Sequence, residues 1–312
     1  MEDITLSIFV PTFNHENYIK TALDSILMQE TKYTYEILVG DDVSQDTTRD
    51  ILKFYEKKYP GRFKMFYRKQ NMLKNSPDNA GDLMKRCKGK YIVALEGDDF
   101  WTDKKKIDTQ INFLEDNPEY IAVAHNCIVV DQNSKIINEV YPECKDEEYT
   151  LKHFGSEIMP GQYTTIMYRN IFRMENVDTS ILFKGLAPGD KILYFVLITH
   201  GRIYCLQKEM SAYRHVKEIG TSYSATYKYN FIEMEYWYKN LVDYAGKLKH
   251  LNAEKYAEAL YVRNLMQGLK RKQCSIFDVI SNLKNITHKF RSLYLWGIYK
   301  INKDLKHKKI WM

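Results

Sequence analysis

Apolar runs and helical stripes alternate over the first hundred residues. Four runs are predicted to be buried strands: LSIFVPTF, YEILVGDD, FKMFYRKQN and KYIVALEGDD. Between them apolar residues recur at helical spacing, as they do from 19 to 27, and Asn14 is available as the cap of that helix. This alternation predicts an α/β fold with a mostly parallel sheet between helices on both faces.

The pattern loosens after residue 104. We expect a helix near 105–116, the strand YIAVAHNCIVV, a polar stretch over 131–150, a strand-like YTTIMY, an apolar helix after Asp190 and a short strand RIYCL. From about Lys228 onward the sequence predicts successive helices. The chain is therefore expected to form an α/β domain over 1–224 and a helical, basic C-terminal region over 225–312.

Composition is that of a soluble globular protein. Of the 312 residues 45% are hydrophobic and 28% charged, and no apolar run approaches the ~20 residues that span a bilayer. The five cysteines are scattered and odd in number, which favours reduced thiols over a disulfide framework or a zinc site. Because no signal peptide is recognised, we expect a cytoplasmic protein.

Positive charge is concentrated at the C-terminal end. From Ala245 onward there are fifteen Lys or Arg and four Asp or Glu, whereas the whole chain carries +6. An apolar helical stripe with basic flanks and two nearby tryptophans runs from Ile286 to the end of the chain. Such a helix is typical of contact with an anionic membrane surface, and the alternative is a helix packed on the first domain with a solvated lysine face. No recognised nucleic-acid-binding module accompanies the charge, so nucleic acid is not expected as a partner.

Two clusters of carboxylates follow predicted strands. Asp41 and Asp42 end the second strand, and Glu96, Asp98 and Asp99 follow the fourth. Ligands of such sheets bind beyond the carboxyl ends of the strands, and closely spaced carboxylates that stay ionised usually share a cation. The alternative is a polar strand end. No GxGxxG or GKS/GKT follows the first strand, so the phosphates of a nucleotide are expected to be held by Mg²⁺ or Mn²⁺ rather than by a glycine-rich loop.

Four blocks occur in the order and spacing of family 2 glycosyltransferases with the GT-A fold: SIFVPTFNHENYIKTALDSIL, EILVGDDVSQDTT, CKGKYIVALEGDDFWTD and PGDKILYFVLITHGRI…MSAYRH. The resemblance covers about 4–224. It implies a nucleotide-binding half at about 1–103, an acceptor-binding half at about 104–224, and an inverting transferase that uses a nucleotide-diphosphate sugar and a divalent metal. The pattern is similar to bacterial enzymes that build capsule, O-antigen or exopolysaccharide units on a lipid carrier, which implies a location at the inner face of the cell membrane.

The resemblance assigns the nucleotide-binding residues. Asp42 matches the acceptor for the uracil N–H, which implies a UDP-sugar, whereas Asp41 caps the loop. Asn71 matches an asparagine near the base or is a turn residue, and Asp98 matches the contact to the ribose hydroxyls. The turn that lines base and ribose, or that simply joins strand to helix, comprises Pro11, Thr12, Phe13 and Asn14.

The metal and catalytic residues follow in the same way. Asp99 matches the metal ligand, and Glu96, in place of a more usual Asp, is expected near the metal without binding it. Asp190 matches the general base that accepts the proton of the acceptor hydroxyl, the alternative being the N-cap of its helix. His215 matches a ligand of metal or phosphate, and Arg214 contacts phosphate or pairs with a surface acid.

Two aromatic positions and two other classes of function stay open. His125 is expected to be a satisfied core histidine, and Trp101 either stacks on a sugar or packs in the core. The other two classes are a catalytically weak sugar-nucleotide-binding scaffold subunit and a receiver-like domain whose strand-end carboxylates bind magnesium and accept a phosphoryl group.

Overall fold

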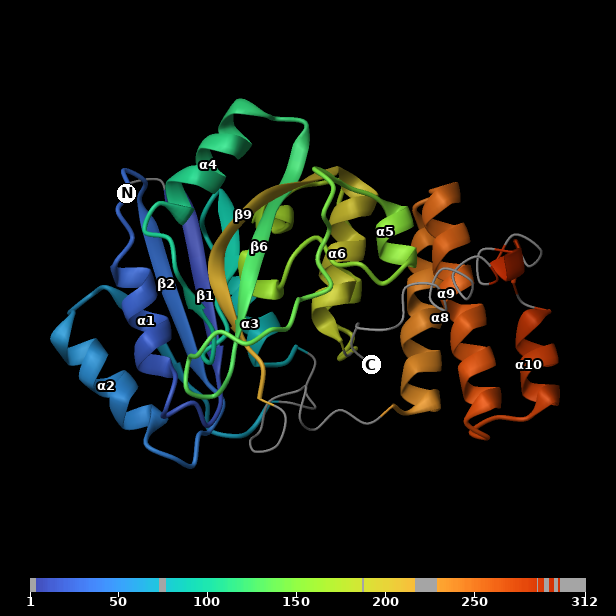
Figure 1. The fold of residues 1–312 in the computed structure, drawn as a ribbon, viewed down its shortest axis with the longest axis horizontal. Coiled ribbons are helices and arrows are strands. Elements are labelled where there is room, and N and C mark those ends of the chain that lie inside the picture. Colours follow the sequence, from blue (N-terminus) through green and yellow to red (C-terminus); the bar gives the residue numbers. More distant parts are fainter. Residues whose placement is uncertain are drawn as a thin grey trace.

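The computed structural model describes residues 4–72, 77–186, 188–216, 229–284, 286–288, 292–294 and 297. A twisted sheet lies between helices, and a helical region is attached at one end of it (Figure 1). The expected boundary at residue 224 lies outside the described residues, as does most of the predicted basic stripe after Ile286.

The first half forms the parallel part of the sheet. Strand β1 (Leu6–Thr12) lies between β2 (Tyr35–Asp41) and β4 (Tyr91–Ala94), and β3 (Phe63–Tyr67) pairs with β2. The connections are the helices α1 (Ile19–Leu27), α2 (Thr48–Lys58) and α3 (Asn79–Arg86). The strands and helices expected here from the hydrophobic pattern are confirmed.

The second half adds strands in both directions. The order across the nine-stranded sheet is β3-β2-β1-β4-β8-β6-β9-β5, and β7 pairs with β9. Its strands are β5 (Phe100–Trp101), β6 (Tyr120–Val130), β7 (Glu148–Tyr149), β8 (Met167–Arg169) and β9 (Arg202–Arg214). Its helices are α4 (Lys106–Asp116), α5 (Leu151–Gly155) and α6 (Gly189–His200), with 3₁₀ turns η1 (Tyr163–Thr165), η2 (Ile171–Arg173) and η3 (Ser180–Phe183).

The helical region consists of α8 (Phe231–Lys247), α9 (Leu251–Lys270) and α10 (Ile276–Leu283). It shares one hydrophobic cluster with the sheet, since Phe9 and Ile92 of the strands, Phe195 of α6 and Trp237 of α8 all belong to it. Helix α6 is buried from Ile192 to Leu197, as expected of a helix that is apolar on every side. A second cluster fills the opposite face of the sheet, beneath α1, α2 and α4. Among the described helices, none has the length and apolarity to cross a membrane.

Three local expectations differ from the structure. Asn14 does not cap α1, which begins at Ile19 after Tyr18 without a side-chain cap. The segment YTTIMY is divided between the turn η1 and the strand β8. The strand expected at RIYCL runs on to Arg214, because its pairing with β6 resumes at Glu209 after an irregularity in register at 207–208. Strand β9 thereby reaches the carboxylates that follow β4.

Candidate active site

Three carboxylates form a compact cluster directly after β4. Oxygens of Glu96, Asp98 and Asp99 lie within 4.8 Å of one another. Asp99 is only 1% exposed, and the other two side chains are half-buried. Three convergent carboxylates are the hard oxygen donors that Mg²⁺ and Mn²⁺ prefer, so these residues fit the divalent cation that the sequence implied.

The loop between these carboxylates lies against the turn that follows β1. The Gly97 N–H donates to the Pro11 carbonyl at 3.1 Å. A Cβ at Gly97 would stand 2.6 Å from His15 Nδ1 and 2.7 Å from Thr12 Oγ1, so only glycine fits there. The other nitrogen of His15 lies 3.8 Å from Asp98 Oδ2. The expected nucleotide turn and the carboxylate cluster therefore form one continuous surface.

Gln162 holds two of the three carboxylates together. Its amide nitrogen donates to Glu96 Oε2 at 3.2 Å and to Asp99 Oδ2 at 2.9 Å. Its oxygen accepts from the backbone N–H of Thr164 at 2.7 Å and from the Thr164 hydroxyl at 2.6 Å. These two bonds fix the direction of the amide, so its N–H groups must face the carboxylates.

Strand β9 supplies the third side of the cluster. The backbone N–H of Arg214 donates to Asp99 Oδ1 at 2.8 Å, and its guanidinium donates to the carbonyls of Asp98 and Asp131, both at 2.8 Å. Arg214 is 2% exposed, so it does not pair with a surface acid. It braces the loop that carries the carboxylates.

The cluster has a surplus of negative charge. Burial, followed by the charges of Asp98 and Asp190, raises the pKa of Glu96 to about 8. Burial also raises the pKa of Asp99 well above its usual range, with Asp98 and Glu96 as further causes. A divalent cation would reverse both shifts, because it favours the ionised carboxylates.

The charge of Asp190 acts on this cluster. The residue is half-buried in the first turn of α6, and burial raises its pKa. After burial, its charge contributes to the raised pKa of Tyr141 and Tyr194 and is the third cause of the shift at Glu96. The N-cap of α6 is Pro188, so the alternative role of Asp190 as the N-cap is wrong.

Helix α8 anchors the start of α6. The indole N–H of Trp237 donates to the carbonyl of Pro188 at 3.3 Å, two residues before Asp190. Trp237 is itself 1% exposed. The position of the Asp190 carboxylate therefore depends on a contact from the helical region.

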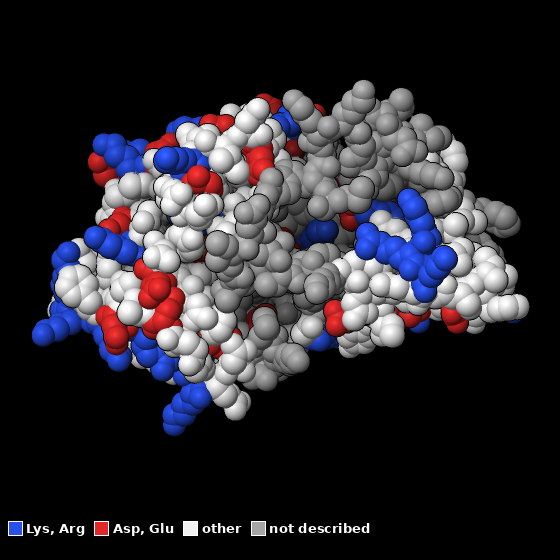
Figure 2. All heavy atoms as spheres, turned by 60° about the horizontal axis from the view of Figure 1, so that its bottom comes forward, with Lys and Arg blue, Asp and Glu red and all other residues white. Residues whose placement is uncertain are grey.

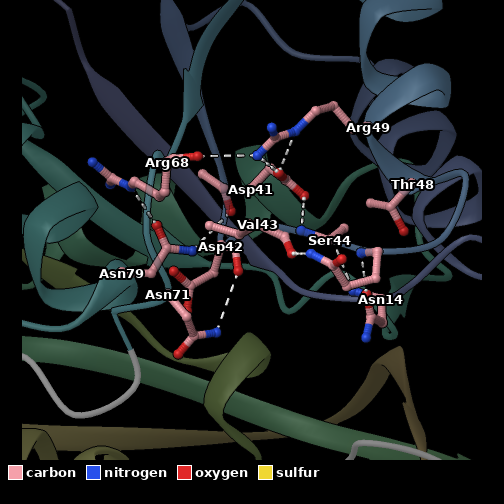
Figure 3. Close-up of polar contacts among 12 residues, drawn as sticks. Asn14, Asp41, Asp42, Val43, Ser44, Thr48, Arg49, Arg68, Asn71 and Asn79 are labelled. Atoms are coloured by element: carbon pink, nitrogen blue, oxygen red, sulfur yellow. Dashed lines mark hydrogen bonds and ion pairs between the residues drawn. The ribbon is translucent and has the colours of Figure 1, made fainter.

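Hydrogen bonds from neighbouring loops hold Asp42, the expected contact of the base (Figure 3). Its carboxylate accepts the Met72 N–H at 2.8 Å, and its carbonyl accepts from the Asn71 amide at 3.3 Å. Its own N–H donates to the Thr12 carbonyl at 2.9 Å, which joins Asp42 to the turn after β1. Burial raises the pKa of Asp42, and the Met72 N–H and the charge of Arg68 partly offset this shift. Asp42, Asn71 and Thr12 are thus brought together.

Asp41 has a different environment from its neighbour. Arg49 binds its carboxylate through Nε, at 2.8 Å, and through a second nitrogen. The Ser44 N–H donates to its other oxygen at 3.4 Å, in keeping with the expected loop-capping role. Figure 3 shows this ion pair on the side of the loop away from Asn71.

Two residues of these loops adopt left-handed backbone conformations. Asn14 has φ 54°, its N–H donates to Ser44 Oγ at 2.9 Å, and its side chain accepts the Gln45 N–H at 2.8 Å. Val43, directly after Asp42, has φ 64°. That conformation is strained for a β-branched residue, and such strain concentrates where a loop is shaped for a ligand.

Three further candidates lie apart from the carboxylates. His215 is buried, with Nδ1 2.9 Å from Glu139 Oε2, and is not part of the cluster, so its role as a ligand stays a prediction. His125 is fully buried, as expected, and burial lowers its pKa well below the usual range. It is not fully satisfied, because Nδ1 lies 2.8 Å from the Asn126 carbonyl whereas Nε2 has no hydrogen-bond partner among the described residues. Trp101 is 1% exposed and donates to the Thr164 carbonyl, so it packs in the core.

The sequence did not single out His15, Gln162, Arg49 or Val43. His15 directly follows the PTFN turn, and that position was the one available signal. Gln162 lies 63 residues beyond Asp99, in a stretch without a periodic pattern. Its role depends on the pairing of β8 between β4 and β6, which no local signal specifies.

Curated relatives match up to two thirds of the chain. The uncharacterized protein Rv1520 of Mycobacterium tuberculosis is 27% identical over 209 residues, which cover 67% of this chain and 58% of that protein. The putative teichuronic acid biosynthesis glycosyltransferase TuaG of Bacillus subtilis is 33% identical over 109 residues, 35% of this chain and 41% of TuaG. The chain thus spans less than two thirds of the length of these relatives.

Solved structures share the fold over a longer stretch. TarS 1–349 of S. aureus in complex with UDP-GlcNAc has a TM-score of 0.62 at 18% identity, covering 95% of this chain and 79% of that one. The mannosyltransferase PcManGT from Pyrobaculum calidifontis, in complex with GDP-Man and Mn²⁺, has a TM-score of 0.50 at 13% identity, with 99% and 89% covered. The fold is therefore GT-A. The family model described as glycosyl transferase family 2 matches residues 7–173, just over half of the sequence, and the chain belongs to that family.

Proposed function

We propose that the protein is an inverting, metal-dependent glycosyltransferase that moves a sugar from a UDP-sugar to a hydroxyl group of a saccharide. The observation that carries the proposal is the carboxylate cluster of Glu96, Asp98 and Asp99, which the turn after β1 links to Asp42 and on which the charge of Asp190 acts. A nucleotide, a diphosphate and a hydroxyl acceptor need an acceptor for the base, ligands for a metal ion and a general base.

Asp99, with Asp98 and Glu96 beside it, would hold Mn²⁺ or Mg²⁺. When bound, such an ion neutralises the negative charge that develops on the departing diphosphate. Asp98 remains the expected contact to the ribose hydroxyls, and Gln162 and Arg214 keep the carboxylates in place. Whether Glu96 contacts the ion depends on its protonation, since its pKa of about 8 is close to neutral pH.

Asp190 would accept the proton of the attacking hydroxyl. A general base works best with a pKa near the working pH, and burial shifts the pKa of this carboxylate in that direction. Direct attack at the anomeric carbon, opposite the leaving diphosphate, gives inversion. The nearby rings of Tyr141 and Tyr163 would line the acceptor side, because Asp190 influences the pKa of both.

Support for uracil comes from Asp42. A carboxylate that is 6% exposed and held by a backbone N–H is a strong acceptor for a ring N–H. The TarS structures with UDP and UDP-GlcNAc, which share this fold, are in keeping with that choice.

The acceptor is proposed to be lipid-linked, in the synthesis of a bacterial surface polysaccharide, with the protein in the cytoplasm at the inner face of the membrane. The printed name of TuaG, which concerns teichuronic acid biosynthesis, supports this class of acceptor. The predicted membrane contact of the stripe after Ile286 falls mostly outside the described residues. A receiver domain is disfavoured, because the nine-stranded sheet and the family model fit a glycosyltransferase.

The deciding experiment incubates the full chain with a panel of UDP-sugars, with Mn²⁺ or with EDTA, and measures the UDP released. GDP-mannose is the control donor. We expect one or more UDP-sugars to be hydrolysed slowly, only with metal, and GDP-mannose not to be. If no donor releases its nucleotide while UDP with Mn²⁺ still raises the melting temperature, the protein is a sugar-nucleotide-binding scaffold instead.

A further inference from the structure

An exposed surface on the helical region is both apolar and basic. Helix α10 buries only Val279 fully, whereas Ile276, Phe277 and Ile280 are 50%, 79% and 49% exposed. The turn that leads into this helix places three exposed basic residues next to it. We call the whole the α10 surface: Lys270, Arg271, Lys272, Ile276, Phe277 and Ile280.

An ordinary solvated helix face is mostly polar, whereas this surface combines exposed apolar side chains with basic ones. The acid of α10, Asp278, is engaged in a capping box, where it accepts from the Ser275 N–H at 2.8 Å and the Ser275 hydroxyl at 2.7 Å. Helix α8 adds exposed Ile232 and Tyr236 at the same end of the bundle. That end is closely packed, because a Cβ at Gly268 would meet the ring of Phe231 at 2.3 Å.

The basic turn of the α10 surface lies on the same side of the molecule as the carboxyl ends of the parallel strands (Figure 1). Strands β1, β2 and β4 are parallel, and the candidate active site lies beyond their carboxyl ends, at the lower side of Figure 1. The turn between α9 and α10 is at the lower side as well. Figure 2, with this side turned forward, shows basic side chains gathered over the helical region beside a largely uncharged surface.

We propose that the α10 surface docks on an anionic lipid bilayer. Cationic side chains are attracted to anionic head groups, and a short helix with exposed Ile and Phe can lie in the interface with its apolar side toward the acyl chains. The inference rests on the proposed function and deepens it, because a lipid-linked acceptor would be presented from the side on which the parallel strands end. The docking itself requires no catalysis.

Docking is measured by sedimentation of the full chain with vesicles of phosphatidylglycerol and phosphatidylcholine, in the absence of any UDP-sugar. Each basic side chain near an anionic surface contributes about fivefold in affinity, so the loss of three alone weakens binding about 100-fold, and K270E/R271E/K272E, which also adds three acids, should bind at least that much more weakly. F277Q/I280Q should bind about tenfold more weakly, with an unchanged melting temperature, because both side chains are exposed. The wild type should lose affinity as salt is raised and should not bind pure phosphatidylcholine.

The matched control is K53E/K57E/K58E on α2, at the opposite end of the molecule (Figure 1), where three exposed lysines surround the 58% exposed Phe54. It changes the net charge equally and should keep the vesicle affinity within about threefold. An equal loss in the control and in K270E/R271E/K272E would overturn the proposal, since attraction would then be due to net charge alone. Absence of binding by the wild type would overturn it as well.

Two further measurements distinguish membrane docking from self-association and from catalysis. If sedimentation velocity shows a dimer that F277Q/I280Q converts to monomer while vesicle binding is unchanged, the surface joins two copies and the proposal is wrong. Metal-dependent hydrolysis of a UDP-sugar in solution should be equal in the wild type and all three variants. Should hydrolysis be absent from the wild type while vesicle binding follows the expected pattern, the proposed enzymatic function fails and the docking surface stands.

Discussion

At the scale of single residues, the site depends on carboxylates whose neighbours oppose their ionisation. Glu96, Asp99 and Asp190 all have a raised pKa, with burial as the largest cause. A protein that needed only a polar strand end would leave such groups in water. Each carboxylate can therefore be tested by a substitution that keeps its shape.

Asp190→Asn should separate catalysis from folding. Because Asp190 is not the N-cap of α6, the amide should preserve the helix, and the affinity for UDP with Mn²⁺ should stay within about twofold. Transfer to an acceptor should fall by ~10²–10⁴, the usual scale for loss of a general base. A stable variant that kept more than about a tenth of the wild-type rate would remove Asp190 from the mechanism.

Gln162→Met should weaken metal binding without removing a ligand. It deletes the N–H groups that hold Glu96 and Asp99, and the loss of such a supporting contact usually costs about tenfold or more in metal affinity. Calorimetric titration with Mn²⁺ in the presence of UDP measures this. Gln110→Met is the matched control: Gln110 is also buried but bonds to the Val123 and Thr165 carbonyls, so this variant should melt lower and keep its metal affinity.

At the scale of elements, the loop after β4 should lower the folding stability of the metal-free protein as the pH rises, because it carries Glu96. The pKa of Glu96 is about 8 in the fold, against an ordinary value near 4.5 in an unfolded chain. Between these values the folded state binds more protons than the unfolded state, so stability is greatest at low pH and falls as pH rises through about 8.

Melting temperatures of the metal-free protein should therefore decline from about pH 5 to about pH 8. The Glu96→Gln variant should decline less steeply, and Mn²⁺ should restore the wild type most strongly at the upper end. If the wild type and Glu96→Gln have parallel profiles, Glu96 does not have the raised pKa.

The segment after α10 is attached to α9 by a buried carboxylate. Glu258 is fully buried and accepts the N–H groups of Thr287 and His288 at 2.7 and 2.8 Å and the Ser292 hydroxyl at 3.3 Å. Ile286 is also buried, whereas Leu293 and Tyr294 are 36% and 66% exposed. The start of the predicted basic stripe thus packs on the helical region, whereas the structural alternative had placed it on the first domain.

Glu258→Gln should lower the free energy of unfolding by about 1–3 kcal/mol, because an amide hydrogen replaces one of the acceptors facing these donors. Urea denaturation measures this loss, and hydrogen exchange should increase at 287 and 288. Glu254→Gln, which removes only the partly exposed contact to His288, should cost less than about 0.5 kcal/mol. Equal effects of the two substitutions would contradict the capping role.

At the scale of the whole molecule, the sheet and the helices should unfold together. One hydrophobic cluster contains Phe9 of β1, Phe195 of α6, Trp237 of α8 and Val279 of α10. We expect one calorimetric transition, with calorimetric and van't Hoff enthalpies that agree. Two resolved transitions would show that residues 229–284 form a separate folding unit.

The sequence predicted those features of the fold that the local pattern of apolar and polar residues controls. The alternation of apolar runs indicated the four parallel strands and their helices, and the spacing of Glu96, Asp98 and Asp99 after the fourth strand indicated one group of carboxylates, whose oxygens lie within 4.8 Å of one another. Gln162 and Arg214 reach Asp99 from 63 and 115 residues away, through strand pairings that periodicity does not encode. The left-handed backbone of Asn14 and Val43 likewise comes from hydrogen bonds and packing between loops, because neither residue type requires it.

The hydrogen bond from Trp237 to Pro188 has a consequence for engineering. Exchanging the C-terminal helices with those of another family member would displace this contact with the start of α6, even if every residue of the candidate active site were retained. A chimera would then bind its donor normally and turn over slowly, and restoring the indole would be the first repair to make. If Asp190 is the general base, the helical region helps to position it and is more than a detachable appendage.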